Sequence, residues 1–122
     1  MPQKGRVAFA SETPHPDNDR LLEISCEELA QKAGSVHVVD VREDEEFEGE
    51  LGHVDGARLM PLASIPARVR ELAKDETIVF VCRSGGRSAR ATALALQAGF
   101  THVFNMKGGM LRWNELGLPT QR

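Results

Sequence analysis

The sequence predicts an α/β protein with a mainly parallel five-stranded sheet and helices on both faces, arranged in three layers. Three observations lead to this prediction. Short apolar segments rich in β-branched residues alternate with segments that carry helical signals. The links between them are short, as in chains that cross over from one parallel strand to the next. The apolar segments are nearly continuous, which is typical of strands buried on both faces.

Local signals mark the elements in chain order. Ser25 and Glu28 form a capping-box pattern at the start of the first helix. Ser64 is expected to cap a later helix whose first turn tolerates Pro66. Gly99 ends an alanine-rich helix, which is the usual place for a glycine. The expected strands are 21–24, 36–41, 57–62, 77–81 and 102–106, and the expected helices are 27–33, 43–50, 65–72, 87–98 and 110–116.

Length and composition indicate one soluble domain. The chain has 122 residues, of which 41% are apolar and 27% are charged. Residues 1–20 contain prolines and little apolar periodicity, so we expect an irregular N-terminal arm before a domain that spans 21–122. A net charge of −3 and the absence of a long apolar run argue against nucleic acid or membrane as a partner. Two cysteines make no disulfide framework, which indicates a cytoplasmic protein.

Cys82 stands where an apolar strand ends and a short loop leads into a helix. The sequence from this residue is Cys82-Arg-Ser-Gly-Gly-Arg-Ser88. The two glycines allow a tight turn, and backbone N–H groups at the helix start face one point together with the positive end of the helix dipole. The two arginines add positive charge. We expect a thiol in this field to ionise more readily than a free cysteine. The loop therefore suits an anion that grows from a sulfur atom.

The alternative for Cys82 is a small buried hydrophobic residue, the common role of a cysteine that ends an apolar strand. The surrounding charges favour a reactive thiol. Between Thr77 and Asn114 the chain has no Asp or Glu, and its five basic residues suggest an anionic ligand. Cys26 has no basic neighbour and no metal-ligand spacing, so we expect a structural role for it. The basic residues of the stretch are Arg83, Arg87, Arg90, Lys107 and Arg112.

The loop from Cys82 to Ser88 resembles the active-site loop of the rhodanese family, the single-domain sulfurtransferases. The resemblance covers about residues 21–120 and implies a rhodanese-like three-layer fold, a catalytic Cys82 and a structural role for His53. The other markers are Val38-Val-Asp-Val-Arg42, Glu46-Phe47, Gly52-His-Val-Asp-Gly-Ala57 with Pro61, Gly108-Gly109, Trp113 and Gly117-Leu-Pro119. The substrate-binding residues that the resemblance implies are Arg83, Ser84, Gly85, Gly86, Arg87 and Ser88.

The sequence departs from the family pattern at three places. Four residues, 48–51, separate Phe47 from Gly52, where the pattern has two. Asp55 stands where a proline is common, and Leu59 where an asparagine is common. These departures concern the local loops and do not touch the cysteine.

The resemblance and the loop together predict sulfur transfer through a persulfide on Cys82. The thiolate would take sulfur from a small anionic donor such as thiosulfate and pass it to cyanide, a thiol or a protein acceptor. No second catalytic side chain, cofactor or metal is expected, because the nucleophile is already ionised and the acidic run 43–50 lacks His or Cys at ligand spacing. Arg87 is expected to hold the loop and its anion by bridging backbone carbonyls and charge. Asp40 and Arg42 end a neighbouring strand and are expected to support the loop, with plain surface charges as the alternative.

Two other functions remain open. A persulfide carrier or a rhodanese-like interaction module serving a partner protein would use the same fold. A cysteine phosphatase is favoured less, because such enzymes use a Cys-x5-Arg loop around a tetrahedral phosphate. Arg87 gives Cys-x4-Arg here, and Ser88 stands at the position that a phosphatase would need for its arginine.

Overall fold

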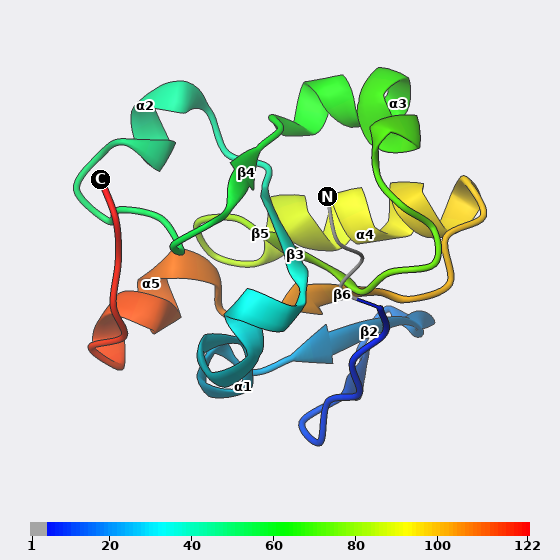
Figure 1. The fold of residues 1–122 in the computed structure, drawn as a ribbon, viewed down its shortest axis with the longest axis horizontal. Helices are drawn as coiled ribbons and strands as arrows, with labels where there is room; N and C mark the ends of the chain where they lie inside the picture. Colours follow the sequence, from blue (N-terminus) through cyan, green and yellow to red (C-terminus); the bar gives the residue numbers. More distant parts are fainter. Residues whose placement is uncertain (1–4) are drawn as a thin grey trace.

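The computed structural model describes residues 5–122, which form one six-stranded sheet with helices on both faces (Figure 1). The strand order is β1-β2-β6-β5-β3-β4. β1 runs antiparallel to β2, and the other neighbouring pairs are parallel. The strands are β1 (Thr13–His15), β2 (Asn18–Ile24), β3 (His37–Asp40), β4 (Arg58–Leu59), β5 (Ile78–Val81) and β6 (Val103–Met106). The helices are α1 (Cys26–Lys32), α2 (Asp44–Phe47), α3 (Ile65–Arg68), α4 (Gly86–Gln97) and α5 (Gly109–Glu115), and short 3-10 segments cover Ala33–Ser35, Leu62–Ser64 and Val69–Glu71.

The two faces of the sheet carry two separate cores, because successive side chains of a strand point to opposite sides. The predicted three layers and mainly parallel sheet are therefore confirmed. On the face of α1 and α5 the core includes Ile24, Leu29, Val38, Val79, Val81, Phe104, Met106, Met110 and Trp113. On the face of α3 and α4 it includes Val39, Ile65, Ile78, Phe80, Cys82, Ala91, Ala95 and Val103. Cys82 thus continues the face that packs under α4.

The N-terminal segment differs from the expected irregular arm. Residues 13–20, predicted to lack regular structure, contribute β1 and the first part of β2, so the sheet has six strands instead of five. Pro14 is tolerated because β1 is the edge strand, where a missing N–H costs no ladder bond on the open side. Residues 1–4 of the predicted arm lie outside the described residues.

At the starts of two helices, polar side chains make other hydrogen bonds than those predicted. Ser25 caps α1 as expected, accepting from the N–H of Glu28 at 3.1 Å. The Glu28 carboxylate does not return to the cap; it accepts from the backbone N–H groups of residues 10–11 at 2.7 and 2.8 Å. Ser64 makes no cap bond, and its hydroxyl donates to the Pro61 carbonyl at 2.6 Å. The predicted helix 65–72 is therefore the short α3 followed by a 3-10 turn.

Candidate active site

Cys82 is buried directly after β5, at the point where the chain turns into α4. Its sulfur accepts two hydrogen bonds within the loop. The backbone N–H of Gly85 donates at 3.0 Å, and the hydroxyl of Ser88 donates at 3.2 Å. Gly85 can aim its N–H at the sulfur because its φ is +106°, a left-handed conformation that a side chain would strain. Two donors directed at one sulfur stabilise negative charge on that atom.

The turn before α5 supports the loop from behind. The N–H groups of Met110 and Leu111 donate to the carbonyls of Cys82 and Arg83, both at 2.9 Å. A Cβ on Gly109 would stand 2.4 Å from the Arg83 carbonyl oxygen, so the loop and the turn approach more closely than any side chain allows. The glycine pair that the sequence marks at 108–109 therefore holds the Cys82 loop in place.

Arg87 has a different partner from the predicted one. Its guanidinium makes a bidentate ion pair with Glu46 of α2, with Nη1–Oε1 at 2.6 Å and Nη2–Oε2 at 2.8 Å. Among the described residues, the Arg87 guanidinium donates to no backbone carbonyl of the loop. The prediction that Arg87 bridges these carbonyls is therefore wrong about its partner. The hydrogen bonds from Arg87 lower the pKa of Glu46 to about 2, and the pKa of Arg87 is raised by the same pair and further by the charge of Cys82. The ion pair ties the start of α4 to α2.

Fewer of the basic side chains between Thr77 and Asn114 are available to bind an anion than the sequence suggests. Arg87 is paired with Glu46, and Arg112 pairs with Glu115 at 3.2 Å, one residue beyond the run without acids. Within residues 5–122, the other three basic residues of the run, Arg83, Arg90 and Lys107, make no ion pair. Arg83 directly follows the cysteine and is exposed, so it is the basic side chain of the loop that remains available to an anion.

Asp40 and Arg42 form a buried pair at the end of β3. The side chains are 0% and 1% exposed, which rules out the alternative of plain surface charges. Arg42 donates from Nε to Oδ1 at 2.9 Å and from Nη2 to Oδ2 at 2.8 Å, and Nη2 also donates to the Gly52 carbonyl at 2.8 Å. Asp40 is in register with Val81, the residue before the cysteine. The pair thus lies where the sequence placed it, beside the strand that carries Cys82.

Two polar residues of the site were missed by the sequence reasoning. Asn105 of β6 and Glu23 of β2 lie behind Ser88, and both are buried among apolar neighbours. The amide of Asn105 donates to Glu23 Oε2 at 2.7 Å, and its oxygen accepts a short hydrogen bond from the Ser88 hydroxyl. The sequence does contain an indication of them: each is a polar residue between apolar neighbours in its strand, and a buried polar side chain needs a hydrogen-bond partner.

Cys26 and His53 take structural roles. The Cys26 thiol is buried against the carbonyls of Lys107 and Gly109, at 3.6 and 3.8 Å. Burial, and then the charge of Glu27, raise the pKa of Cys26 to about 11, so this thiol stays neutral at ordinary pH. His53 stacks on the Phe47 ring at 3.7 Å and its Nδ1 lies 2.8 Å from the Phe47 carbonyl, as expected of a structural residue.

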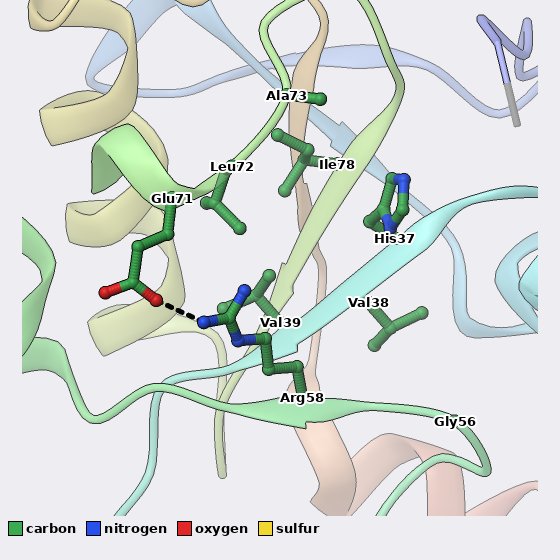
Figure 2. A pocket seen from close by; sticks show the side chains of 9 residues that line it. All are labelled: His37, Val38, Val39, Gly56, Arg58, Glu71, Leu72, Ala73 and Ile78. Atoms are coloured by element: carbon green, nitrogen blue, oxygen red, sulfur yellow. Dashed lines mark hydrogen bonds and ion pairs between the residues drawn. The ribbon is translucent and has the colours of Figure 1, made fainter. Parts of the chain in front are cut away.

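One cavity lies away from Cys82. It has a volume of about 350 Å³ and lies near the starts of β3 and β5, where Arg58 points toward Glu71 and Leu72 and Ile78 lie to one side of this pair (Figure 2). A smaller cavity of about 290 Å³ adjoins the loop at Arg83. Its other lining residues come from β3's end and from 45–51, including the segment with two additional residues. The chemistry of the loop, and not cavity size, identifies the candidate site.

Neither a metal site nor a bilayer-spanning helix is found among residues 5–122. No three His, Cys, Asp or Glu side chains converge there to hold an ion. The helices of the same region lack the length and apolar character that a crossing requires.

Comparisons with known proteins agree with this geometry. The family model described as "Rhodanese-like domain" matches residues 25–116. A "Sulfurtransferase" of Allochromatium vinosum is 38% identical over 100 residues, covering 80% of this chain and 92% of that protein. A "Putative sulfur carrier protein" of Bacillus subtilis is 37% identical, covering 75% of this chain and 50% of that protein. The crystal structure of a rhodanese-related protein from Thermoplasma volcanium superposes with a TM-score of 0.73 at 27% identity, over 80% of this chain and 94% of that one.

Proposed function

This chain belongs to the rhodanese-like domain family, and we propose that it is a sulfurtransferase that works through a persulfide on Cys82. The observation that carries the proposal is the pair of donors, the Gly85 N–H at 3.0 Å and the Ser88 hydroxyl at 3.2 Å, directed at one buried sulfur. These donors point at the atom that would carry the negative charge of a thiolate, the nucleophile that sulfur transfer needs. The relative named as a sulfurtransferase, which aligns along most of both chains, supports the same activity.

The proposed reaction has two steps. The Cys82 thiolate attacks the outer sulfur of an anionic donor such as thiosulfate; the new S–S bond forms, the old one breaks, and sulfite leaves with the electron pair. An acceptor thiolate or cyanide then attacks the terminal sulfur and releases the thiolate. The first amides of α4 have no intrahelical acceptor, and together with the loop they would bind the charged terminal sulfur. The loop residues that would contact the substrate are Arg83, Ser84, Gly85, Gly86, Arg87 and Ser88.

Asp40 and Arg42 would support this loop without touching the substrate. Their buried ion pair joins the end of β3 to the Gly52 carbonyl, beside the strand that carries the nucleophile. No cofactor is needed in this reaction, since each step exchanges one S–S bond for another bond to sulfur. The two free cysteines fit a reducing compartment, so a cytoplasmic location is part of the proposal.

A persulfide carrier that serves a partner protein is the second candidate, and it uses the same chemistry with a protein as acceptor. The name of the Bacillus subtilis relative supports it. Turnover of thiosulfate with small thiols, compared with sulfur delivery to candidate proteins, separates the two. Rapid turnover with cyanide or a small thiol alone favours the enzyme.

A phosphatase is disfavoured by the loop and by Arg87. The spacing is Cys-x4-Arg, one residue shorter than a phosphate cradle, and the guanidinium is engaged by Glu46. We expect no hydrolysis of aryl phosphates. Inserting one glycine after Gly86 should enlarge the loop and weaken sulfur transfer. Efficient Cys82-dependent aryl phosphate hydrolysis by the unmodified chain would overturn the assignment.

Mass spectrometry after thiosulfate treatment tests the proposal directly. One added sulfur, removed by cyanide, should appear on the peptide that contains Cys82. Cys82→Ser should abolish both the added mass and turnover, and Cys26→Ser, which changes a buried structural thiol, should leave both nearly intact. A comparable loss in the Cys26 variant contradicts the one-cysteine mechanism.

A further inference from the structure

A continuous chain of hydrogen bonds runs from Cys82 away from the loop and into the sheet. Ser88 Oγ lies 3.2 Å from the sulfur and also bonds Asn105 Oδ1, and Asn105 Nδ2 lies 2.7 Å from Glu23 Oε2. The three residues behind the cysteine come from α4, β6 and β2, and their exposed fractions are 0%, 1% and 6%. Asn105 also bonds the loop itself at the Gly85 carbonyl, in addition to the backbone bonds that join the loop to the α5 turn.

The orientation of the Asn105 amide is fixed by its neighbours. Its nitrogen faces two groups that accept, the Glu23 carboxylate at 2.7 Å and the Gly85 carbonyl at 3.2 Å. An amide oxygen cannot stand there, since it would have no donor and would face two other oxygens. Oδ1 must therefore turn toward Ser88. Glu23 thus determines that Asn105 presents an acceptor, and not a donor, to the serine.

Ser88 has one hydroxyl proton and more than one acceptor for it. The Asn105 oxygen is the nearest, and the Cys82 sulfur and the Gly85 carbonyl lie at 3.2 and 3.3 Å. When Cys82 is a neutral thiol, the hydroxyl can donate to Asn105 and accept from the S–H. When the sulfur is ionised, the hydroxyl must turn to the sulfur, because a hydrogen bond to a charged acceptor is the stronger one. Each ionisation of Cys82 therefore takes the proton away from Asn105.

We propose that Asn105 and Glu23 are positioning residues for the Cys82 chemistry: they hold an acceptor against Ser88 and so limit how strongly its hydroxyl stabilises the sulfur anion. This inference rests on the proposed function of Cys82 as the sulfur-carrying nucleophile. A thiolate that is stabilised less is a better nucleophile. When the terminal sulfur is loaded, the negative charge moves one atom outward, and the Ser88 hydroxyl returns to Asn105. The acceptor of the Ser88 hydroxyl thus changes with the charge on the Cys82 sulfur during the reaction cycle.

The charged groups around Cys82 set the background for the test. Arg87 of α4 interacts electrostatically with the cysteine, and its guanidinium is held by Glu46 of α2. Arg83 is the adjacent residue, and Glu23 of β2 lies at the far end of the hydrogen-bond chain. The groups directly between Glu23 and the sulfur, on β6 and α4, are the neutral side chains of Asn105 and Ser88.

The test measures the pH dependence of Cys82 alkylation by iodoacetamide, read by peptide mass spectrometry on the folded full chain. In Asn105→Leu the hydroxyl has lost its nearest acceptor and is free for the sulfur, so the pH midpoint of alkylation should fall by about 0.5–1 unit. The alkylation rate at high pH should fall about twofold, because the thiolate becomes less nucleophilic. In Ser88→Ala the midpoint should rise by a similar amount, since the sulfur loses a donor. Thr92→Val is the matched control, because among the described residues the Thr92 hydroxyl bonds only the Ser88 carbonyl, and the midpoint of this variant should not move.

A double variant tests whether the effect passes through Ser88. In the Ser88→Ala background, Asn105→Leu should leave the midpoint unchanged. The proposal is overturned if Asn105→Leu lowers the midpoint as much in the Ser88→Ala background as in the wild type. It is also overturned if the folded Asn105→Leu single variant has an unchanged or raised midpoint. Should Asn105→Leu fail to fold, Glu23→Gln provides the test instead. This change removes a negative charge and weakens the hold on the Asn105 amide, and both effects should lower the pH midpoint of Cys82 alkylation. An unchanged midpoint refutes the proposal. Alkylation needs no sulfur donor, so absence of a persulfide in the wild type would refute the proposed function separately.

Discussion

The ion pair between Arg87 and Glu46 should make the stability of the protein depend on pH in a predictable way. Glu46→Gln keeps the shape of the side chain and removes its charge. The pair is bidentate, with N–O distances of 2.6 and 2.8 Å, and it is the largest cause that lowers the pKa of Glu46 from 4.5 to about 2, with a smaller contribution from the Glu43 N–H. Because the folded-state pKa is depressed, the stabilisation is fully present above about pH 4.5 and is lost as the pH falls through about 2.

The magnitude follows from this pKa and from exposure. A lowering from 4.5 to about 2 corresponds to about 3.4 kcal/mol at neutral pH for a pair fully shielded from solvent. The Arg87 and Glu46 side chains are 37% and 29% exposed, so solvent screening reduces this to about 1–2 kcal/mol. By pH 3 less than about half of that difference should remain.

Urea denaturation of the wild type and of Glu46→Gln at pH 7, 5 and 3 measures the difference. Glu45→Gln is the matched control, because this exposed neighbour on α2 makes no ion pair among the described residues, and its effect should stay within about 0.5 kcal/mol. A Glu46→Gln effect that equals that of Glu45→Gln, or that does not shrink toward pH 3, would refute the assignment of the stabilisation to this ion pair.

Three other predictions concern the supports of the loop. Asp40→Asn leaves the Arg42 charge buried without its partner, so it should cost about 3–5 kcal/mol in urea denaturation and reduce sulfur transfer; a near wild-type melting temperature contradicts this. Gly109→Ala places a Cβ 2.4 Å from the Arg83 carbonyl, so it should cost about 1–3 kcal/mol and impair persulfide formation, whereas Gly34→Ala, with nothing within 4 Å, should do neither. Cys26 should resist iodoacetamide at pH 8 while Cys82 reacts, because burial raises the pKa of Cys26 to about 11; equal labelling of both in the folded protein would be inconsistent with it.

Sequence patterns were sufficient where the determining interactions are close along the chain. The strand before Cys82, the glycines after it and the start of α4 lie within one short stretch. The structure has them as predicted, apart from the strand beginning at 78 instead of 77 and the helix beginning at Gly86 instead of 87. The parallel sheet with helices on both faces also followed from local signals, because strand and helix alternation leaves few other topologies. The hairpin of β1 and β2 was missed, since prolines and charges in 13–20 conceal a strand that is stable only as an edge added to the sheet.

By itself, the sequence determined which thiol stands at the strand-to-helix junction, the spacing of its loop and the apolar segments of the sheet, because these depend on neighbours along the chain. Only the tertiary structure decided the partners of the polar side chains. Arg87 meets Glu46 across 41 residues, and Asn105 meets Glu23 across 82. Asn105 and Glu23 pair because the packing of β2 and β6 excludes water, so these buried polar groups must satisfy each other. Arg87 and Glu46 stay partly exposed and pair because the fold brings α2 to the start of α4. No local pattern specifies either neighbour.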